Sequence, residues 1–299
     1  MVARGEQGRV WRLDTGTGAL AIKELIILQT PADAVADVAY QEAVLATGAV
    51  AMPRPIRTVA GNVLLDVAGH QVRAYEWIDL LATDLGLDPL VIGETLAAIH
   101  QVHYAPARPV IGWYTEPVGA LRWTQLLDDA KAAAAPFADA LAAEIPELLR
   151  LEALIEPPTN LQGCHRDLWA DNILPTPTGG VCVIDWENCG LSDPAQEILM
   201  AMIDFAFADQ RRVADLYLSY VEAGGPGRVS SYGSFTMVIA QFGHFWESAI
   251  SAYLSTSAAE VKAHSLDRIA ELLNLPLRVE HLEEMLGHNR IYPVSHRSQ

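Results

Sequence analysis

The stretch Cys164–Leu174, CHRDLWADNIL, is followed closely by residues 181–190, VCVIDWENCG. The first stretch holds the pattern H-x-D-x-x-x-x-N, in which Asp167 is the acid and Asn172 the last residue. The second is an apolar run that ends in another acid, Asp185. A carboxylate beside buried apolar strands costs free energy unless it is paired. The two stretches therefore indicate chemistry rather than packing.

Phosphoryl transfer needs residues of these types. A carboxylate must orient the acceptor hydroxyl and accept its proton, which suits Asp167. Mg²⁺ prefers oxygen ligands, which suits Asn172 and Asp185. Glu187 is a candidate auxiliary metal ligand, because it lies on the same side as Asp185 if the chain stays extended. The structural alternative makes Asp167 and Asp193 turn or helix caps, and the dipeptide after Leu191-Ser192, Asp-Pro, is typical of a helix start.

Lysine is rare in this chain, which contains only Lys23, Lys131 and Lys262. Lys23 ends the apolar run ALAIK, where an ammonium group needs an anionic partner. The next predicted helix offers Glu42, which shares one helical face with Val35, Val38 and Leu45. We therefore expect a Lys23–Glu42 ion pair. The alternative is that both side chains extend to solvent.

The predicted elements divide the chain into a β-rich and a helical part. Residues 8–25 predict a hairpin around the turn DTGTG, and the helix that follows has Thr30 as N-cap, Pro31 in its first turn and Gly48 after its end. Residues 51–79 return to strand character, and from residue 80 the chain is mainly helical apart from two short strands at 172–174 and 181–185. The helices are expected to begin at Asp88-Pro89 and then to lie near 121–135, 137–155, 194–208, 210–223, 232–254, 258–273 and 278–286.

Composition excludes several classes of protein. At 299 residues and 51% hydrophobic content the chain can bury a large core. A formal net charge of -17 argues against nucleic acid as a partner and favours cationic small molecules. No apolar run is long enough for a membrane helix, and the N-terminal residues lack the apolar core of a signal peptide. Three cysteines do not make a disulfide framework, so we expect a reducing, cytoplasmic location.

The cysteines also raise the possibility of a zinc site. Cys164, His165, Cys182 and Cys189 lie close together in the sequence. Their spacings do not match the paired C-x2-4-C pattern of structural zinc sites. We expect small buried thiols near the active site instead.

The order of these motifs resembles the kinase superfamily. A glycine-containing hairpin, AIK, a helical glutamate, HRDLWADN and VIDWE follow one another in the chain. YQEAVLATGAVAMPRPI, LAAIH, HRDLWADNIL and IDWENCGLSDPAQEI are similar to the aminoglycoside phosphotransferase and choline kinase-like group of small-molecule kinases. The resemblance covers residues 5–200 and weakens toward the C-terminus. Each motif alone is only moderately specific, so the evidence lies in their order.

The resemblance implies an α+β, bilobal, protein-kinase-like fold. Its β-rich nucleotide-binding lobe with one main helix would span residues 1–79, and a larger, mainly helical catalytic and substrate-binding lobe would span 80–299. A hinge at 75–80 would join them. The nucleoside triphosphate would be ATP or GTP, with Mg²⁺ as the metal.

The resemblance also implies a role for each matching residue. Asp167 would be the catalytic base, and Asn172 and Asp185 would bind Mg²⁺. Lys23 would hold the α- and β-phosphates, with Glu42 orienting it. The remaining nucleotide contacts would come from the loop RGEQG and the hinge YEWI, that is from Gly5, Gly8, Tyr75, Glu76, Trp77 and Ile78.

Two departures from the kinase pattern affect these assignments. The loop reads G-x-x-G-x-V rather than G-x-G-x-x-G, which weakens the assignment of its phosphate contacts. Only seven residues, WENCGLS, separate Asp185 from Asp193. That gap leaves no room for an activation segment or a platform for a peptide substrate, so the pattern argues against a protein kinase.

The predicted reaction is transfer of the γ-phosphoryl group to a hydroxyl of a small cationic molecule. An aminoglycoside or another basic antibiotic, such as a tuberactinomycin-type peptide, fits the negative charge and would be inactivated by the added phosphate. The alternatives are a metabolic kinase of an amino sugar, choline-like alcohol or other polyol, and a catalytically inactive kinase fold used as a binding module. The sequence leaves the oligomeric state open. Candidate substrate contacts are Asp193, Glu197, Asp204, Trp246 and Glu247.

Overall fold

The computed structural model describes residues 2–4, 8–206, 209–275 and 277–291. The chain forms two compact units, Met1–Pro109 with Asn160–Gly227, and Val110–Thr159 with Arg228–Gln299. The first unit combines the β-rich part with the segment that carries both opening motifs. The boundaries of these units differ from the predicted lobes at 1–79 and 80–299, and the units do not test that division, which stays a prediction.

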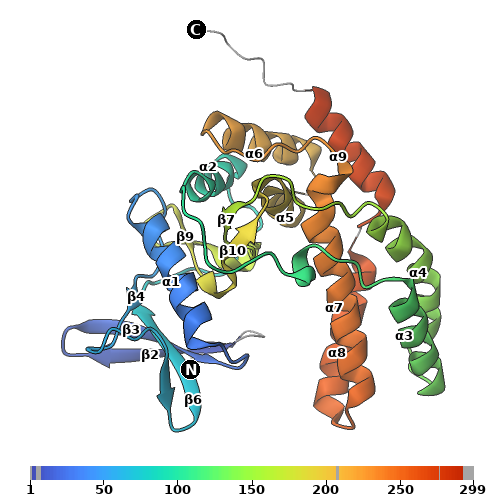
Figure 1. Ribbon diagram of the computed structural model, residues 1–299, viewed down its shortest axis with the longest axis horizontal. Coiled ribbons are helices and arrows are strands. Elements are labelled where there is room, and N and C mark those ends of the chain that lie inside the picture. The colour runs from blue at the N-terminus through green and yellow to red at the C-terminus, as the bar shows by residue number, and fades with distance from the viewer. Residues whose placement is uncertain (1, 5–7, 207–208, 276, 292–299) are drawn as a thin grey trace. The chain divides into compact units, whose positions relative to one another are not determined.

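An antiparallel sheet forms the N-terminal part of the first unit (Figure 1). Its strands follow the order β1-β2-β3-β6-β4, and β5 also pairs with β6. The predicted hairpin is confirmed, since β2 and β3 pair from Gly8–Leu25 to Thr15–Gly18. Lys23 on β3 lies opposite Arg73 on β6. The strands are β1 (Ala3–Arg4), β2 (Gly8–Thr15), β3 (Gly18–Leu25), β4 (Pro55–Ile56), β5 (Leu65–Val67) and β6 (His70–Glu76).

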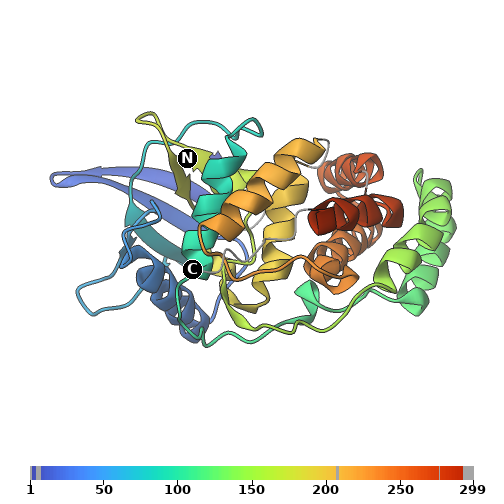
Figure 2. The same cartoon turned by 90° about the horizontal axis from the view of Figure 1, so that it is seen from above.

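Helix α1 (Pro31–Leu45) lies beside this sheet in both overall views (Figures 1 and 2). The predicted N-cap is confirmed, because the Thr30 hydroxyl accepts a hydrogen bond from the Asp33 backbone N–H at 3.1 Å. The buried face of this helix is shifted by one residue from the predicted face, although Val38 is buried as predicted. Ala34 and Val38 pack in a small core with Val63, whereas Val35 is 50% exposed.

The rest of the first unit contains three packed helices and two pairs of short strands. Helices α2 (Pro89–His100), α5 (Pro194–Ala206) and α6 (Gln210–Glu222) pack together, and Figure 2 shows α2 beside α6. Gly93 permits that close approach, because a side chain there would collide with the backbone of α6. The predicted pair of short strands is confirmed as β8 (Ile173–Pro175) with β9 (Val181–Val183). A second pair joins β7 (Gln162–Cys164) to β10 (Gly190–Ser192).

In its described residues, the second unit consists of helices and the irregular segments that connect them. Its core includes Trp123 and Trp246, both fully buried. The Trp123 indole N–H donates to Glu152 at 2.9 Å, which ties α3 to α4. The helices are α3 (Ala120–Ala132), α4 (Ala138–Glu152), α7 (Thr236–Ser255), α8 (Ala259–Asn274) and α9 (Val279–Ile291). In the described part of the chain, no helix is both long enough and apolar enough to cross a bilayer.

Candidate active site

The predicted catalytic loop follows β7 and is held in an unusual backbone conformation. Arg166 has a φ of 67°, a left-handed value that costs a non-glycine residue about 1–2 kcal/mol. Its guanidinium group donates to the carbonyls of Asn188 at 2.7 Å, Pro109 at 2.9 Å and Cys189 at 3.2 Å. The buried side chain of Arg166 therefore connects the HRD loop to the segment after Asp185.

Glu197 anchors the same loop from α5. Its carboxylate accepts from the backbone N–H of His165 at 3.1 Å, from the N–H of Arg166, and it pairs with His100 Nε2 at 2.7 Å. Burial alone would raise the pKa of Glu197, but the hydrogen bond and charge of His100 outweigh it and the pKa is lowered. Its side chain is 0% exposed, so the prediction that Glu197 contacts the substrate is wrong.

Asp167 occupies the centre of the loop. Its Oδ2 accepts a hydrogen bond from Asn188 Nδ2 at 3.0 Å. Burial raises the pKa of Asp167 to about 6, while the Asn188 hydrogen bond and the charge of Lys23 oppose that shift. The residue is only half-buried, which leaves it accessible to an acceptor hydroxyl. The geometry is that required of a general base with one oxygen held in place.

The predicted metal ligands Asn172 and Asp185 follow Asp167 along the chain, one before and one after the β8–β9 pair. Asn172 donates its side-chain N–H to the Asp167 carbonyl at 2.8 Å, and the N–H of Ile184 donates to the Asn172 carbonyl at 3.0 Å. The side-chain oxygen of Asn172 is left as a possible ligand, and the backbone bond to Ile184 holds it near Asp185, the next residue. One amide oxygen and one carboxylate are ligands that suit Mg²⁺, so the residues present fit the implied metal.

Asp185 is the second non-glycine residue of the site with a left-handed backbone, with a φ of 65°. It follows β9, and this conformation turns the chain into the short helix Trp186–Asn188. Its carboxylate is bonded to the ammonium group of Lys23. Burial and the repulsion of Glu187 raise the pKa of Asp185, whereas Lys23 lowers it.

Lys23 is only 9% exposed and lies between two carboxylates. Besides Asp185, its Nζ contacts Glu187 Oε2 at 3.0 Å. Burial would lower the pKa of Lys23, but the charges of Glu187 and Asp185 outweigh it and the pKa is raised. Lys23 is thus buried and ion-paired as predicted, but its partners are Asp185 and Glu187.

Glu42 does not reach Lys23, so the predicted ion pair between them is wrong. Its carboxylate accepts from the Arg57 guanidinium at 2.8 and 3.1 Å, on the surface, where the Glu42 side chain is 42% exposed. The cause is the buried face of α1, which lies one residue, or about 100°, away from the predicted stripe. That rotation turns Asp37 toward the sheet instead.

Asp37 was missed by the sequence reasoning and forms a buried charge cluster. Its carboxylate contacts Arg73 Nη2 at 3.1 Å and Arg108 Nη1 at 2.8 Å. Burial raises the pKa of Asp37 to about 6, against the lowering effect of Arg108 and then Arg73. The available signal was Arg73 itself, which lies between the apolar residues Val72 and Ala74 of a strand and needs an anionic partner if it is buried.

The predicted hinge residues lie in different surroundings. Tyr75 is buried, and its hydroxyl donates to Glu187 Oε1 at 2.8 Å, so its side chain is committed to the cluster around Lys23. Glu76 is exposed, and Trp77 donates its indole N–H to Asp79 at 2.8 Å. Nucleotide contacts by Tyr75, Glu76, Trp77 and Ile78 stay predictions.

The glycines of the predicted phosphate loop are only partly described. Gly5 lies outside the described residues. At Gly8 an added Cβ would lie 2.8 Å from the Glu24 carbonyl and 3.1 Å from Lys23 Cε. Glycine is favoured there because a Cβ would collide with the Glu24 carbonyl of the neighbouring strand.

The other predicted substrate contacts have structural partners. Asp193 is buried and caps α5, accepting from the N–H of Ala195 at 3.0 Å, so the capping alternative is confirmed for it. Asp204 accepts from the Ala170 N–H at 2.6 Å and keeps a partly exposed side chain. In the second unit Trp246 is fully buried, which makes its predicted substrate contact wrong.

Glu247 pairs with Arg122 at 2.6 Å in the second unit. Its side chain is still partly exposed. Of the five predicted substrate contacts, Asp204 and Glu247 therefore stay candidates.

The cysteines do not indicate a zinc site. All three are buried and free of disulfides. The described residues bring Cys164 close to His100 and Glu197. However, His100 is engaged on both ring nitrogens, by Glu197 and by the Tyr220 hydroxyl at 2.8 Å. This group is an internal hydrogen-bond cluster behind the catalytic loop.

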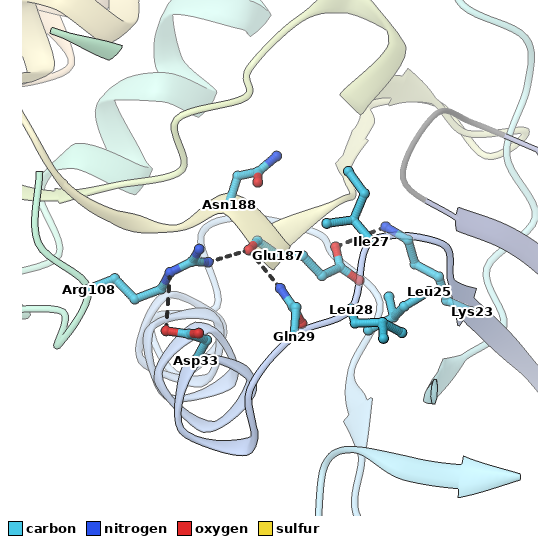
Figure 3. Close-up of a pocket in the computed structure, with 9 residues that line it drawn as sticks. All are labelled: Lys23, Leu25, Ile27, Leu28, Gln29, Asp33, Arg108, Glu187 and Asn188. Carbon is cyan, nitrogen blue, oxygen red and sulfur yellow. Dashed lines mark hydrogen bonds and ion pairs between the residues drawn. The ribbon is translucent and has the colours of Figure 1, made fainter. Parts of the chain in front are cut away.

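A cavity of about 160 Å³ adjoins the site within the first unit (Figure 3). Among the lining residues, Glu187 lies between Lys23 and Arg108, and Asn188 lies above it in this view. Its remaining lining residues are Leu25, Ile27, Leu28, Gln29 and Asp33. The cavity thus opens beside both Lys23 and Asn188, the residue that is hydrogen-bonded to Asp167.

Comparisons with known proteins agree with this geometry. The model of the phosphotransferase enzyme family, APH, matches residues 2–232. No curated protein is significantly similar in sequence.

Solved structures of kinases share the fold. Spectinomycin phosphotransferase in complex with ADP and spectinomycin is 13% identical with a TM-score of 0.68, over 96% of this chain and 90% of that chain. Amicoumacin kinase in complex with AMP-PNP and Ca²⁺ is 13% identical with a TM-score of 0.60, over 91% and 87%. A choline/ethanolamine kinase family protein from Mesorhizobium loti is 16% identical with a TM-score of 0.54, over 96% and 94%. The predicted α+β kinase-like fold is thereby confirmed.

Proposed function

Because this chain belongs to the phosphotransferase enzyme family, we propose that it moves the γ-phosphoryl group of ATP to a hydroxyl of a cationic small molecule. The chain is an ATP-dependent small-molecule phosphotransferase. The cationic acceptor, the metal and the role of each residue go beyond that statement.

The observation that carries the proposal is the continuous set of contacts from Lys23 to Asp167. Lys23 is bonded to Asp185, whose preceding residue is hydrogen-bonded to Asn172 at 3.0 Å. Asn172 in turn is bonded to the Asp167 backbone at 2.8 Å. The residues that we propose as the phosphate-binding cation, the two metal ligands and the base are thus connected to one another, which supports phosphoryl transfer.

Each residue of the cluster has one task in this proposal. Lys23 binds the phosphates of the nucleotide, and Asp167 orients the acceptor hydroxyl and takes its proton. Asn172 and Asp185 hold Mg²⁺. When bound, the metal neutralises negative charge on the phosphates.

A cationic acceptor is supported by charge and by the related structures. The chain carries a formal net charge of -17, which attracts cations to its surface. The structurally similar kinases include a spectinomycin phosphotransferase, an amicoumacin kinase and a choline/ethanolamine kinase family protein. Asp204 in the first unit is a partly exposed carboxylate and our candidate for contact with an amine of such an acceptor. Glu247 in the second unit is a separate candidate of the same kind. We favour an aminoglycoside or another basic antibiotic, with a choline-like alcohol or amino sugar as the second candidate.

A panel assay tests the acceptor class. The protein would be incubated with ATP, Mg²⁺ and equal concentrations of aminoglycosides, a tuberactinomycin-type peptide, choline, amino sugars and neutral polyols, and ADP release would be followed. We expect acceptor-dependent release with a basic member of the panel, and replacement of ATP by GTP gives the nucleotide preference. Turnover with neutral polyols alone would contradict the cationic acceptor while leaving the phosphotransferase assignment in place.

A further inference from the structure

The ammonium group of Lys23 has partners that both come from the segment after β9. It contacts Asp185 and Glu187, the latter at 3.0 Å. If Asp185 binds the metal as proposed, its carboxylate is shared with a second cation. Glu187 is then the anion whose main charged partner is the lysine.

Glu187 is well placed to hold a lysine still. It is 3% exposed, and its Oε1 accepts a hydrogen bond from the Tyr75 hydroxyl at 2.8 Å, while Oε2 faces Lys23. Arg73 Nη1 lies 3.8 Å from the same Oε1. Oε1 of Glu187 is thus held by Tyr75 of the sheet, and Oε2 is directed at Lys23.

Helix α1 offers no carboxylate to Lys23. Glu42 binds Arg57 at the surface, and Asp37 is paired with Arg73 and Arg108. Asp33 accepts from the Thr30 hydroxyl at 2.7 Å. Every acid of this described helix is therefore engaged elsewhere.

The helix is connected to Glu187 through its backbone instead. The Glu187 carbonyl accepts from Arg108 Nη1 at 2.6 Å and from Gln29 Nε2 at 3.2 Å (Figure 3). The same two side chains donate to Asp37, Arg108 at 2.8 Å and Gln29 at 3.1 Å. Asp37 and Glu187 are thus held by shared donors, and these donors link α1 to the residue that contacts the lysine.

We infer that Glu187 is the positioning residue of the phosphate-binding Lys23, fixed by Tyr75 and linked to α1 through Arg108 and Gln29. The inference rests on the proposed function, because it assumes that Lys23 binds nucleotide. It differs from the predicted role of Glu187 as an auxiliary metal ligand. The two roles separate when the metal is removed, since a lysine-positioning residue affects nucleotide binding without any metal.

Three variants test the inference. Glu187→Gln removes the charge at constant shape, Tyr75→Phe removes only the hydroxyl that fixes Glu187, and Glu42→Gln is the matched control on α1. The dissociation constant of ADP would be measured by calorimetry with EDTA present, and the Mg²⁺ concentration for half-maximal turnover would be measured separately. We expect Glu187→Gln to weaken metal-free ADP binding about tenfold and Tyr75→Phe about threefold, on the scale of one charged and one ordinary hydrogen bond. Glu42→Gln should match the parent protein.

The outcomes distinguish the possible roles. Unchanged or tighter ADP binding in Glu187→Gln, or a shift in the Mg²⁺ requirement alone, would overturn the inference in favour of a metal ligand. An effect of Glu42→Gln as large as that of Glu187→Gln would overturn it too. If Glu187→Gln does not fold, Tyr75→Phe decides by the same criteria. A parent protein that binds no nucleotide would instead contradict the proposed function.

Discussion

Replacing Asp167 by asparagine is expected to lower kcat by about a hundredfold or more while ATP binding stays close to that of the parent protein. Asparagine keeps the shape of the side chain but cannot accept the acceptor proton. Lys23, Asn172 and Asp185 are unchanged in this variant, so the nucleotide and metal contacts should persist. Initial rates with the best acceptor and calorimetry with ATP would measure the two effects.

Asp171→Asn is the matched control for this substitution. Asp171 lies four residues along the same loop, is exposed and accepts a hydrogen bond from Thr83. We expect it to retain parental kcat. If Asp167→Asn turned over acceptor as fast as the parent, Asp167 could not be the base. A parent that binds ATP but phosphorylates no acceptor would instead support the inactive binding module.

Replacing Glu197 by leucine is expected to lower the free energy of unfolding by about 3–5 kcal/mol, the usual cost of removing one partner from a buried charged group. Two backbone N–H groups of the catalytic loop, at His165 and Arg166, would lose their acceptor, and so would His100. Each unsatisfied buried donor is costly. Urea denaturation measures the loss, and Glu197→Gln, which keeps one oxygen acceptor, should be destabilised less.

Glu94→Leu on α2 provides the control, because Glu94 is exposed. It should change stability by less than about 0.5 kcal/mol. Parental stability of Glu197→Leu together with a raised KM for the acceptor would contradict the anchoring role. That result would restore the original prediction that Glu197 contacts the substrate.

Residues close together in the sequence were predicted well. The hairpin, the Thr30 cap and the paired strands β8 and β9 depend on turn and cap chemistry that a few neighbouring residues determine. The order of AIK, HRDLWADN and VIDWE was sufficient to predict the kinase-like fold. These signals are local or sequential, so they are readable without the structure.

Helix α1 shows why the rest of the site could not be predicted. Its sequence PADAVADVAYQEAVL places alanine or valine on more than one face, so the buried face is poorly defined by hydrophobicity. Because the buried face is shifted by one residue from the predicted face, Glu42 lies at the surface and Asp37 lies in the buried charge cluster. The partners of Lys23 are instead Asp185 and Glu187, which lie 162 and 164 positions along the chain, and no periodicity in the sequence predicts such distant contacts.

The central claim is tested most directly by following the γ-phosphate of ATP into the product. ATP labelled in that group would be incubated with the parent protein and the acceptor found in the panel, and the product examined by phosphorus NMR and mass spectrometry. The account predicts that the label is recovered as a phosphate ester on a hydroxyl of the acceptor, and that Asp167→Asn does not form this ester. Label recovered only as inorganic phosphate, or on an amine of the acceptor, would contradict it.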